Sequence, residues 1–201
     1  MNYVHLLRGA IMAALLATAA VSAAPPGDSL YQLDAALTDA AGQRFALRDM
    51  AGGPVLVTMF YGDCNAACPI IIETLKRTVA ALGPAAKPLR VLMISLDPLH
   101  DSPAGLAMQL QMHQLDPARF RLAVARDETQ TRTLAHTLNI KFRTLDSGDI
   151  NHTTRIVLLD AAGAQRAASS RLDPAPDPLF VKQIAALLKD PKTGSDQGIL
   201  K

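Results

Sequence analysis

Two cysteines separated by three residues are the feature of this 201-residue chain with the clearest chemical potential. Cys64 and Cys68 are its only cysteines, and Pro69 follows the second of them. A disulfide between them would close a ring too small to stabilise the fold much, because disulfide stabilisation grows with loop length. We therefore expect the pair to carry out redox chemistry or to bind a metal ion rather than to act as a small structural disulfide.

The sequence around the cysteines places them where a strand leads into a helix. The apolar run from Pro54 to Tyr61 predicts a buried strand, and apolar residues between Ala67 and Leu82 recur at helical spacing. A helix N-terminus favours the thiolate, which is the reactive and metal-binding form of cysteine. Residues four apart in a helical turn rise about 6 Å along the axis, which permits either a disulfide or two sulfur ligands to one ion.

Two sulfurs alone make an incomplete metal site. Soft sulfur ligands favour Cu(I), with Zn(II) as an alternative, and a third ligand is expected. The candidates are the methionines and the histidines that follow the cysteines, His100, His113, His136 and His152. We favour His152, because it directly precedes a predicted strand from Arg155 to Leu159, and in a thioredoxin-like topology the loop entering this strand packs against the cysteine turn.

The remaining candidates receive simpler interpretations. His100 follows a predicted strand and could lie near the cysteines, whereas His136 is expected to face solvent on a helix. Asp97 and Asp101 are expected to fix a loop and a helix cap rather than to take part in chemistry.

Met108 and Met112 fall on one face of a predicted helix and are followed by His113. Such a pair could form a thioether copper site. We expect core packing instead, because methionine fills irregular cores readily.

The N-terminal segment resembles a cleavable signal peptide over residues 1–24. Arg8 precedes an apolar run from Ile11 to Val21, and small residues follow at Ser22 to Ala24. The apolar run is shorter than the roughly 20 residues that span a bilayer, and no cysteine follows it to carry a lipid. We therefore expect an exported periplasmic protein that meets the membrane only through a partner. Its thiols would then lie in an oxidising compartment.

Composition excludes some other classes of function. The chain is 49% hydrophobic and 19% charged, with a formal net charge of +2. This balance gives no concentrated basic face of the kind that nucleic-acid binding requires. The length suffices for one domain with a proper core, which we place at residues 25–190, followed by a flexible polar tail at 191–201.

The order of predicted elements indicates the fold class. It comprises a hairpin within 29–47, a strand at 54–61, a helix at 67–82, a strand at 89–96, helices at 102–115 and 127–138, a strand pair at 155–159 and 165–169, and a helix at 177–188. Residues 120–124 are expected to form a short connection. Strands joined by crossover helices, with an antiparallel hairpin at one edge, predict an α/β sandwich with a central mixed sheet flanked by helices and an N-terminal β-hairpin.

Three motifs together resemble the SCO/SenC family. They are Cys64-x3-Cys68-Pro69 after an apolar strand, Asp97-Pro98 followed by Asp101-Ser102-Pro103, and His152 before Val157-Leu158-Leu159-Asp160. The resemblance spans residues 33–188 and implies a thioredoxin-like copper protein that helps to assemble the copper centre of cytochrome c oxidase. It also implies that Cys64, Cys68 and His152 are the copper ligands. The partner would be a copper-accepting protein such as an oxidase subunit.

The chain departs from the family pattern near these residues. Asn65 stands where a proline is usual after the first cysteine, Asn151 replaces an aspartate before the histidine, and Gly148 occupies the place of a tyrosine. The three ligand positions are intact. The departures bear on copper affinity, preferred oxidation state and choice of partner.

Two other functions use the same cysteines. A thiol–disulfide oxidoreductase would keep the cysteines of a copper-accepting protein reduced, with Cys64 attacking, Cys68 resolving and a thioredoxin-like protein as reductant. A peroxide-scavenging enzyme would need a threonine and an arginine around its reactive thiol, and Thr58 and Arg155 are the candidates.

Overall fold

The computed structural model describes residues 27–62, 67–171, 173 and 175–190. The expected signal peptide at 1–24 and the expected tail at 191–201 lie outside the described residues, and so does Cys64. In the part of the chain that is described, no helix combines the length and the apolar character needed to cross a membrane.

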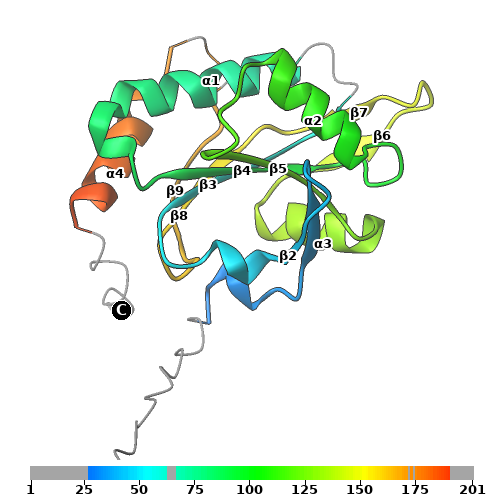
Figure 1. Ribbon diagram of the computed structural model, residues 1–201, viewed down its shortest axis with the longest axis horizontal. Coiled ribbons are helices and arrows are strands. Elements are labelled where there is room, and N and C mark those ends of the chain that lie inside the picture. The colour runs from blue at the N-terminus through cyan, green and yellow to red at the C-terminus, as the bar shows by residue number, and fades with distance from the viewer. Residues whose placement is uncertain (1–26, 63–66, 172, 174, 191–201) are drawn as a thin grey trace, which may run out of the picture.

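A seven-stranded mixed sheet forms the centre of the molecule, in the order β2-β1-β5-β4-β3-β8-β9 (Figure 1). Its strands are β1 (Ala36–Asp39), β2 (Arg44–Ala46), β3 (Val55–Phe60), β4 (Arg90–Ser95), β5 (Phe120–Ala125), β8 (Ile156–Leu159) and β9 (Gln165–Ser169). Strands β3, β4 and β5 are parallel, while β1–β2 and β8–β9 form antiparallel edges. The predicted mixed sheet with an N-terminal hairpin is therefore confirmed.

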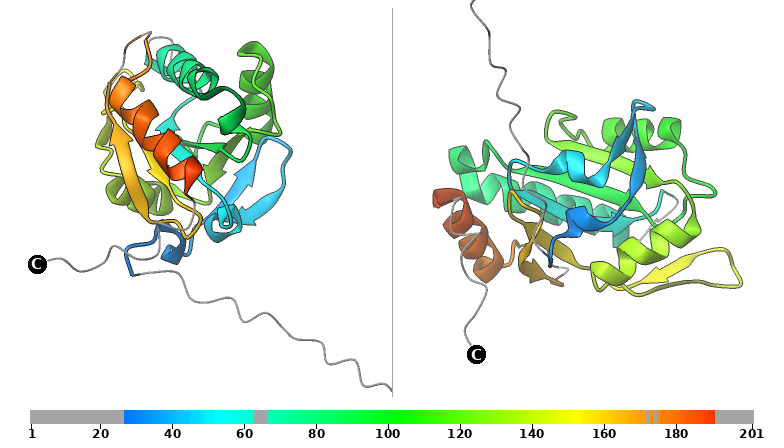
Figure 2. Two further views of the ribbon diagram at one scale, coloured as in Figure 1. Left: turned by 90° about the vertical axis from the view of Figure 1, so that its left-hand side faces the viewer. Right: turned by 90° about the horizontal axis from the view of Figure 1, so that it is seen from below.

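Helices cover both faces of this sheet. They are α1 (Ala67–Leu82), α2 (Pro103–Met112), α3 (Glu128–Thr137) and α4 (Pro178–Lys189), with short 3-10 helices at Leu30–Gln32, Leu47–Met50 and Gly83–Ala86. Helices α1 and α2 lie over one face and α3 lies over the other (Figure 1). Helix α4 packs against α1 and β9 (Figure 2).

Strand β3 lies within the core and leads toward the cysteine segment. All six of its residues, Val55 to Phe60, are buried. It pairs in parallel with β4 and antiparallel with β8, so both of its edges are covered as well. This burial explains why its sequence reads as one continuous apolar run.

The prediction that residues 120–124 form a connection is wrong. They belong to β5, which pairs in parallel with β4 and antiparallel with β1, and Leu122 and Ala123 are fully buried. Arg121 interrupts the apolar pattern of this strand. Its guanidinium lies 3.5 Å from the centre of the Phe45 ring and pairs with Asp39, so a charged residue occupies a strand position without being left in an apolar environment.

A second two-stranded sheet was not predicted. Strands β6 (Phe142–Thr144) and β7 (Ile150–His152) pair antiparallel, and Gly148 has a φ of 90° in the turn between them. The strands are only three residues long, and Ile150 is the only buried residue in them. Such short and polar strands lack the alternation that identifies a hairpin in a sequence.

The Asp39–Arg121 pair offers a test of how the N-terminal hairpin is held. One carboxylate oxygen of Asp39 accepts the N–H groups of Ala41 and Gln43, and the other accepts two N–H groups of Arg121 at 2.9 and 2.7 Å. Burial opposes ionisation, but the hydrogen bonds from Arg121 and from the turn outweigh it and lower the pKa of Asp39. The folded protein therefore holds this carboxylate ionised at a lower pH than the unfolded chain does.

We expect Asp39→Asn to lower the free energy of unfolding at pH 7 by about 2 kcal/mol, because Arg121 would lose its charged partner. Since the folded pKa lies below the unfolded value, the contribution is complete above about pH 4 and is lost as the pH falls through the folded pKa. Urea unfolding at pH 7 and pH 3 should show the difference between wild type and variant shrinking at the lower pH. Asp34→Asn is the control, since the Asp34–Arg48 pair is 3.5 Å apart and largely exposed; an equal effect there would contradict the argument.

Candidate metal centre

The structure describes the three expected ligands to different extents. Cys64 lies outside the described residues. Cys68 is in the first turn of α1, with its backbone described and its side chain not. His152 is fully described as the last residue of β7. The geometry of the site is therefore built from His152 and from the residues that lead into the cysteine segment.

His152 lies beside Tyr61, the residue that follows β3. The β3–β8 pairing extends to Val57 and Val157, whereas His152 itself is paired with Phe142 of β6. The rings of Tyr61 and His152 are in contact, with centroids 6.1 Å apart and planes at 82°, an edge-to-face arrangement. The cysteine turn lies outside the described residues, so the expected packing of this segment against it stays a prediction; the contact that the structure shows is with Tyr61, three residues before Cys64.

The two ring nitrogens of His152 have different environments. Nδ1 lies 3.2 Å from the carbonyl oxygen of Thr153, which can only accept, so Nδ1 carries the proton and donates. Nε2 is buried and has no hydrogen-bond partner among the described residues. In this tautomer Nε2 presents its lone pair, which is the arrangement found in histidines that bind a metal through one nitrogen while the other donates to a carbonyl.

Burial also sets the protonation state of His152. It lowers the pKa of the imidazole, and the hydrogen bond to Thr153 offsets only part of this effect. The neutral ring, which is the ligating form, is therefore favoured at neutral pH. An unpartnered nitrogen on a half-buried neutral imidazole fits a site for a metal ion.

Both backbone polar groups of Gly62, its N–H and its carbonyl, form hydrogen bonds to side chains. Its N–H donates to the two carboxylate oxygens of Asp101 at 3.1 and 3.0 Å, and its carbonyl accepts the side-chain amide of Gln109 at 3.0 Å. The hydroxyl of Ser95 donates to the same carboxylate. A Cβ at position 62 would lie 2.3 Å from an Asp101 oxygen, so glycine is required here. Asp101 does not cap α2 as expected, because the N-cap is Ser102; its carboxylate instead holds Gly62 and Ser95.

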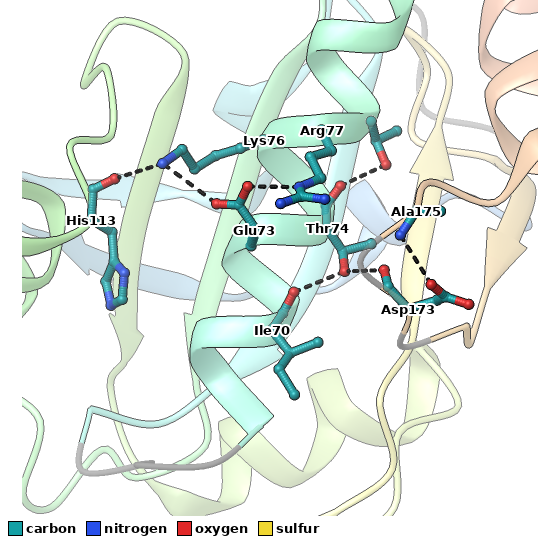
Figure 3. A network of polar contacts seen from close by, with 9 residues as sticks. Ile70, Glu73, Thr74, Lys76, Arg77, His113, Asp173 and Ala175 are labelled. Carbon is teal, nitrogen blue, oxygen red and sulfur yellow. Dashed lines mark hydrogen bonds and ion pairs between the residues drawn. The ribbon is translucent and has the colours of Figure 1, made fainter.

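Helix α1, which carries Cys68 in its first turn, is tied to its neighbours on two sides (Figure 3). The ammonium of Lys76 donates to the carbonyl of His113 at 3.3 Å, just beyond the end of α2. The hydroxyl of Thr74 lies 2.8 Å from the carbonyl of Ile70 in its own helix and 3.2 Å from the carbonyl of Asp173 in the segment before α4, so its single proton is shared between these two acceptors. These contacts fix the position of the helix that follows the cysteine segment.

The other histidines do not join His152. The side chain of His100 is 76% exposed and pairs with the carboxylate of Asp97 at 2.8 Å. His136 is exposed on α3, as expected. Among the described residues, no three histidine, cysteine, aspartate or glutamate side chains converge as a metal-binding group, which leaves His152 as the only expected ligand whose side-chain geometry is defined.

Thr58 and Arg155 do come together, but in a structural contact. The Thr58 hydroxyl, which is fully buried, donates to the backbone carbonyl of Arg155 at 2.8 Å. This hydrogen bond links β3 to the residue that precedes β8. The hydroxyl proton of Thr58 is therefore already used within the sheet. The Nε of Arg155 is buried without a hydrogen-bond partner among the described residues. The arrangement of threonine and arginine that a peroxide-binding thiol requires is therefore not formed by the Thr58 hydroxyl.

His152 as a ligand stays a prediction, and the contacts formed near it and before Cys64 were not indicated by the sequence. Tyr61, Gly62 and Gln109 received no role from the sequence. A glycine immediately after a buried strand was the available signal for a close backbone contact, whereas the contacts of Tyr61 and Gln109 depend on tertiary packing.

The SCO1/SenC family model matches residues 24–188. A search of curated proteins found no match. Among solved structures, a SCO1/SenC family lipoprotein from Bacillus anthracis is 17% identical, with a TM-score of 0.70 over 82% of this chain and 95% of that one.

Two further structures were solved with copper bound. ScoI from Bradyrhizobium japonicum is 23% identical, with a TM-score of 0.60 over 77% of this chain and 95% of that one. Yeast Sco1 is 20% identical, with a TM-score of 0.65 over 78% of this chain and 87% of that one. At these identities the similarity shows the fold, which is the expected thioredoxin-like sandwich.

Proposed function

Because the chain belongs to the SCO1/SenC family, we propose that it is a copper metallochaperone that delivers copper to the copper centre of cytochrome c oxidase or to another cuproenzyme. The observation that carries the proposal is His152, whose buried Nε2 is without a hydrogen-bond partner among the described residues and whose ring contacts Tyr61. The copper-bound relatives support the choice of metal. We place the protein in the periplasm, after removal of residues 1–24.

The proposed ligands are Cys64, Cys68 and His152. Two thiolates and a neutral imidazole around Cu(I) would carry a net charge of −1 and match the preference of this ion for soft ligands. Three ligands leave a side of the ion open to a thiolate or imidazole of the acceptor. Copper would then pass by ligand exchange, without release of a free ion.

The contacts around Gly62 support this function. The hydrogen bonds of Gly62, which donates to Asp101 and accepts from Gln109, fix the chain two residues before Cys64, while the proton on Nδ1 of His152 keeps the other ring nitrogen available as a ligand. A protein that exchanges a bound ion needs donors held in place before the ion arrives, because preorganisation lowers the cost of binding.

Anaerobic titration of the reduced protein with copper tests the proposal. We expect one tightly bound equivalent of copper, because the proposed cysteine and histidine ligands form a single site, and we expect thiolate-to-copper charge-transfer absorption when Cu(II) is used. The same sample, loaded with Cu(I), should lose its ion to a thiol-containing acceptor at a rate that increases with acceptor concentration.

The thiol–disulfide oxidoreductase alternative predicts a different result. In that case copper would bind weakly or not at all, and the reduced protein would rapidly reduce a disulfide in a copper-accepting protein, becoming oxidised at Cys64 and Cys68. This outcome would replace the metallochaperone proposal. Full copper binding with slow disulfide reduction would support it.

A further inference from the structure

Two methionines expected in the core are on the surface. The side chains of Met108 and Met112 are 62% and 65% exposed, whereas Met50, Met59 and Met93 are at most 2% exposed. The prediction of core packing for the pair is therefore wrong. Helix α2 also ends at Met112 instead of Leu115, since Gln114 takes up a left-handed φ of 52°.

The helix that carries the pair has an uncharged surface. Helix α2 contains no acidic or basic residue from Pro103 to Met112, and its exposed positions are Ala104, Met108, Gln111 and Met112. Isolated exposed apolar side chains are common in proteins, so exposure by itself indicates nothing. What distinguishes this face is that its two large side chains both end in thioether sulfur and that no charged group of the helix lies among them.

The two sulfurs can reach one ion. Residues four apart on a helix share a face, with a rise of about 6 Å between them, and methionine has three rotatable bonds beyond its backbone. Thioethers are soft, neutral ligands that select Cu(I) over harder cations. The exposed positions leave both side chains free to turn toward a common ion.

The helix beneath them is firmly held. Leu106 is buried on the opposite side, and Gln109 donates to the Gly62 carbonyl at 3.0 Å. Beyond the helix, the carbonyl of His113 accepts the ammonium of Lys76 (Figure 3). A fixed backbone with mobile side chains lets two thioethers close on an ion without moving the fold.

We propose that Met108 and Met112 form a second site, for the soft monovalent ion Cu(I), on the exposed face of α2. The site goes beyond the proposed cysteine–histidine site and uses none of its ligands. Neutral thioethers bind Cu(I) less tightly than thiolates do, so the ion exchanges faster here. Gln109, which lies between the two methionines in sequence, contacts Gly62, so the helix that carries the new site also contacts the chain two residues before Cys64.

Silver titration of the Cys64→Ser/Cys68→Ser variant tests this site separately from the proposed cysteine–histidine site. Ag(I) has the charge and the ligand preference of Cu(I) and is stable in air. With carbon-13 in the methionine methyl groups, NMR should show the resonances of Met108 and Met112 shifting together along one binding curve that saturates at one Ag(I) per chain. The resonances of the buried Met50, Met59 and Met93 should stay in place, which also verifies that the variant is folded.

A spacing variant provides the matched control. Ala104→Met/Met108→Ala keeps two exposed methionines on the same face but separates them by eight residues, a rise of about 12 Å that one ion cannot bridge. We expect its Ag(I) affinity to fall at least tenfold, as in Met112→Leu. Separate binding curves for the two methyl groups, absence of any shift, or equal affinity in the spacing variant would overturn the proposal, and none of these results would bear on copper binding by the cysteines.

Discussion

His152→Ala is expected to lower the affinity of the reduced protein for Cu(I) by about a hundredfold or more, which corresponds to at least roughly 2.7 kcal/mol of binding free energy. The reason is that the substitution removes the one neutral nitrogen ligand and leaves two thiolates that a single ion would share with solvent. Competition with a chromophoric Cu(I) chelator under anaerobic conditions measures the affinity. Cys64→Ser and Cys68→Ser should lose at least as much, because each removes a charged ligand.

The comparison with other histidines makes this result specific. His100→Ala and His136→Ala should leave the Cu(I) affinity unchanged, since both side chains are exposed and neither contacts the described part of the site. His152→Ala should remain folded, because it removes a buried nitrogen that lacks a hydrogen bond among the described residues along with its packing on Tyr61. If His152→Ala kept full Cu(I) affinity, histidine would be excluded from the ligand set.

The sequence predicted the elements that carry strong local signals. The buried run of β3, the limits of α1 at Ala67 and Leu82, and the helix caps at Ser102 and Asp127 all appear in the structure where expected. These signals depend on residues near one another in the chain: a continuous apolar stretch, helical periodicity, and a side-chain oxygen before the first turn. The strand after His152 also appears as β8, while the role of His152 as a ligand stays a prediction.

The features that the sequence did not predict depend on distant partners. Arg121 could be read as a loop residue because nothing local shows that Phe45 and Asp39 accommodate its guanidinium. The exposure of Met108 and Met112 depends on which face of α2 meets the sheet. The helix has apolar residues on several sides, so its sequence left that choice open.

Asp101 is another residue, near the candidate site, whose role depends on distant partners. Its substitution has the second of the two largest expected effects. Its position before the Ser102 cap suggested a local role, yet its carboxylate accepts the N–H of Gly62 and the hydroxyl of Ser95. Asp101→Ala would leave both donors without this acceptor. Each unsatisfied buried donor costs about 1–3 kcal/mol, so we expect the free energy of unfolding to fall by about 3 kcal/mol, as measured by urea denaturation.

Asp97→Ala is the matched control for this substitution. Asp97 lies on the same loop, but its carboxylate accepts only exposed hydrogen bonds from His100 among its described contacts. The Asp97 side chain is only 20% exposed, but because its hydrogen bonds go to the exposed His100, we expect Asp97→Ala to lower the free energy of unfolding by no more than about 1 kcal/mol. Similar losses for the two variants would show that Asp101 acts merely as a loop residue.

The effect of Asp101→Ala on copper distinguishes positioning from general stability. Without the carboxylate, the backbone of Gly62 keeps only the hydrogen bond from Gln109 to its carbonyl among the contacts described above. The chain two residues before Cys64 then gains conformational entropy, which must be lost again when an ion binds. We therefore expect the folded variant to bind Cu(I) about tenfold more weakly, a cost of roughly 1.4 kcal/mol. A destabilised variant of the hairpin at the far edge of the sheet, Asp39→Asn, should keep the full affinity. Equal weakening in both variants would mean that lower stability, and not the hold on Gly62, reduces copper binding.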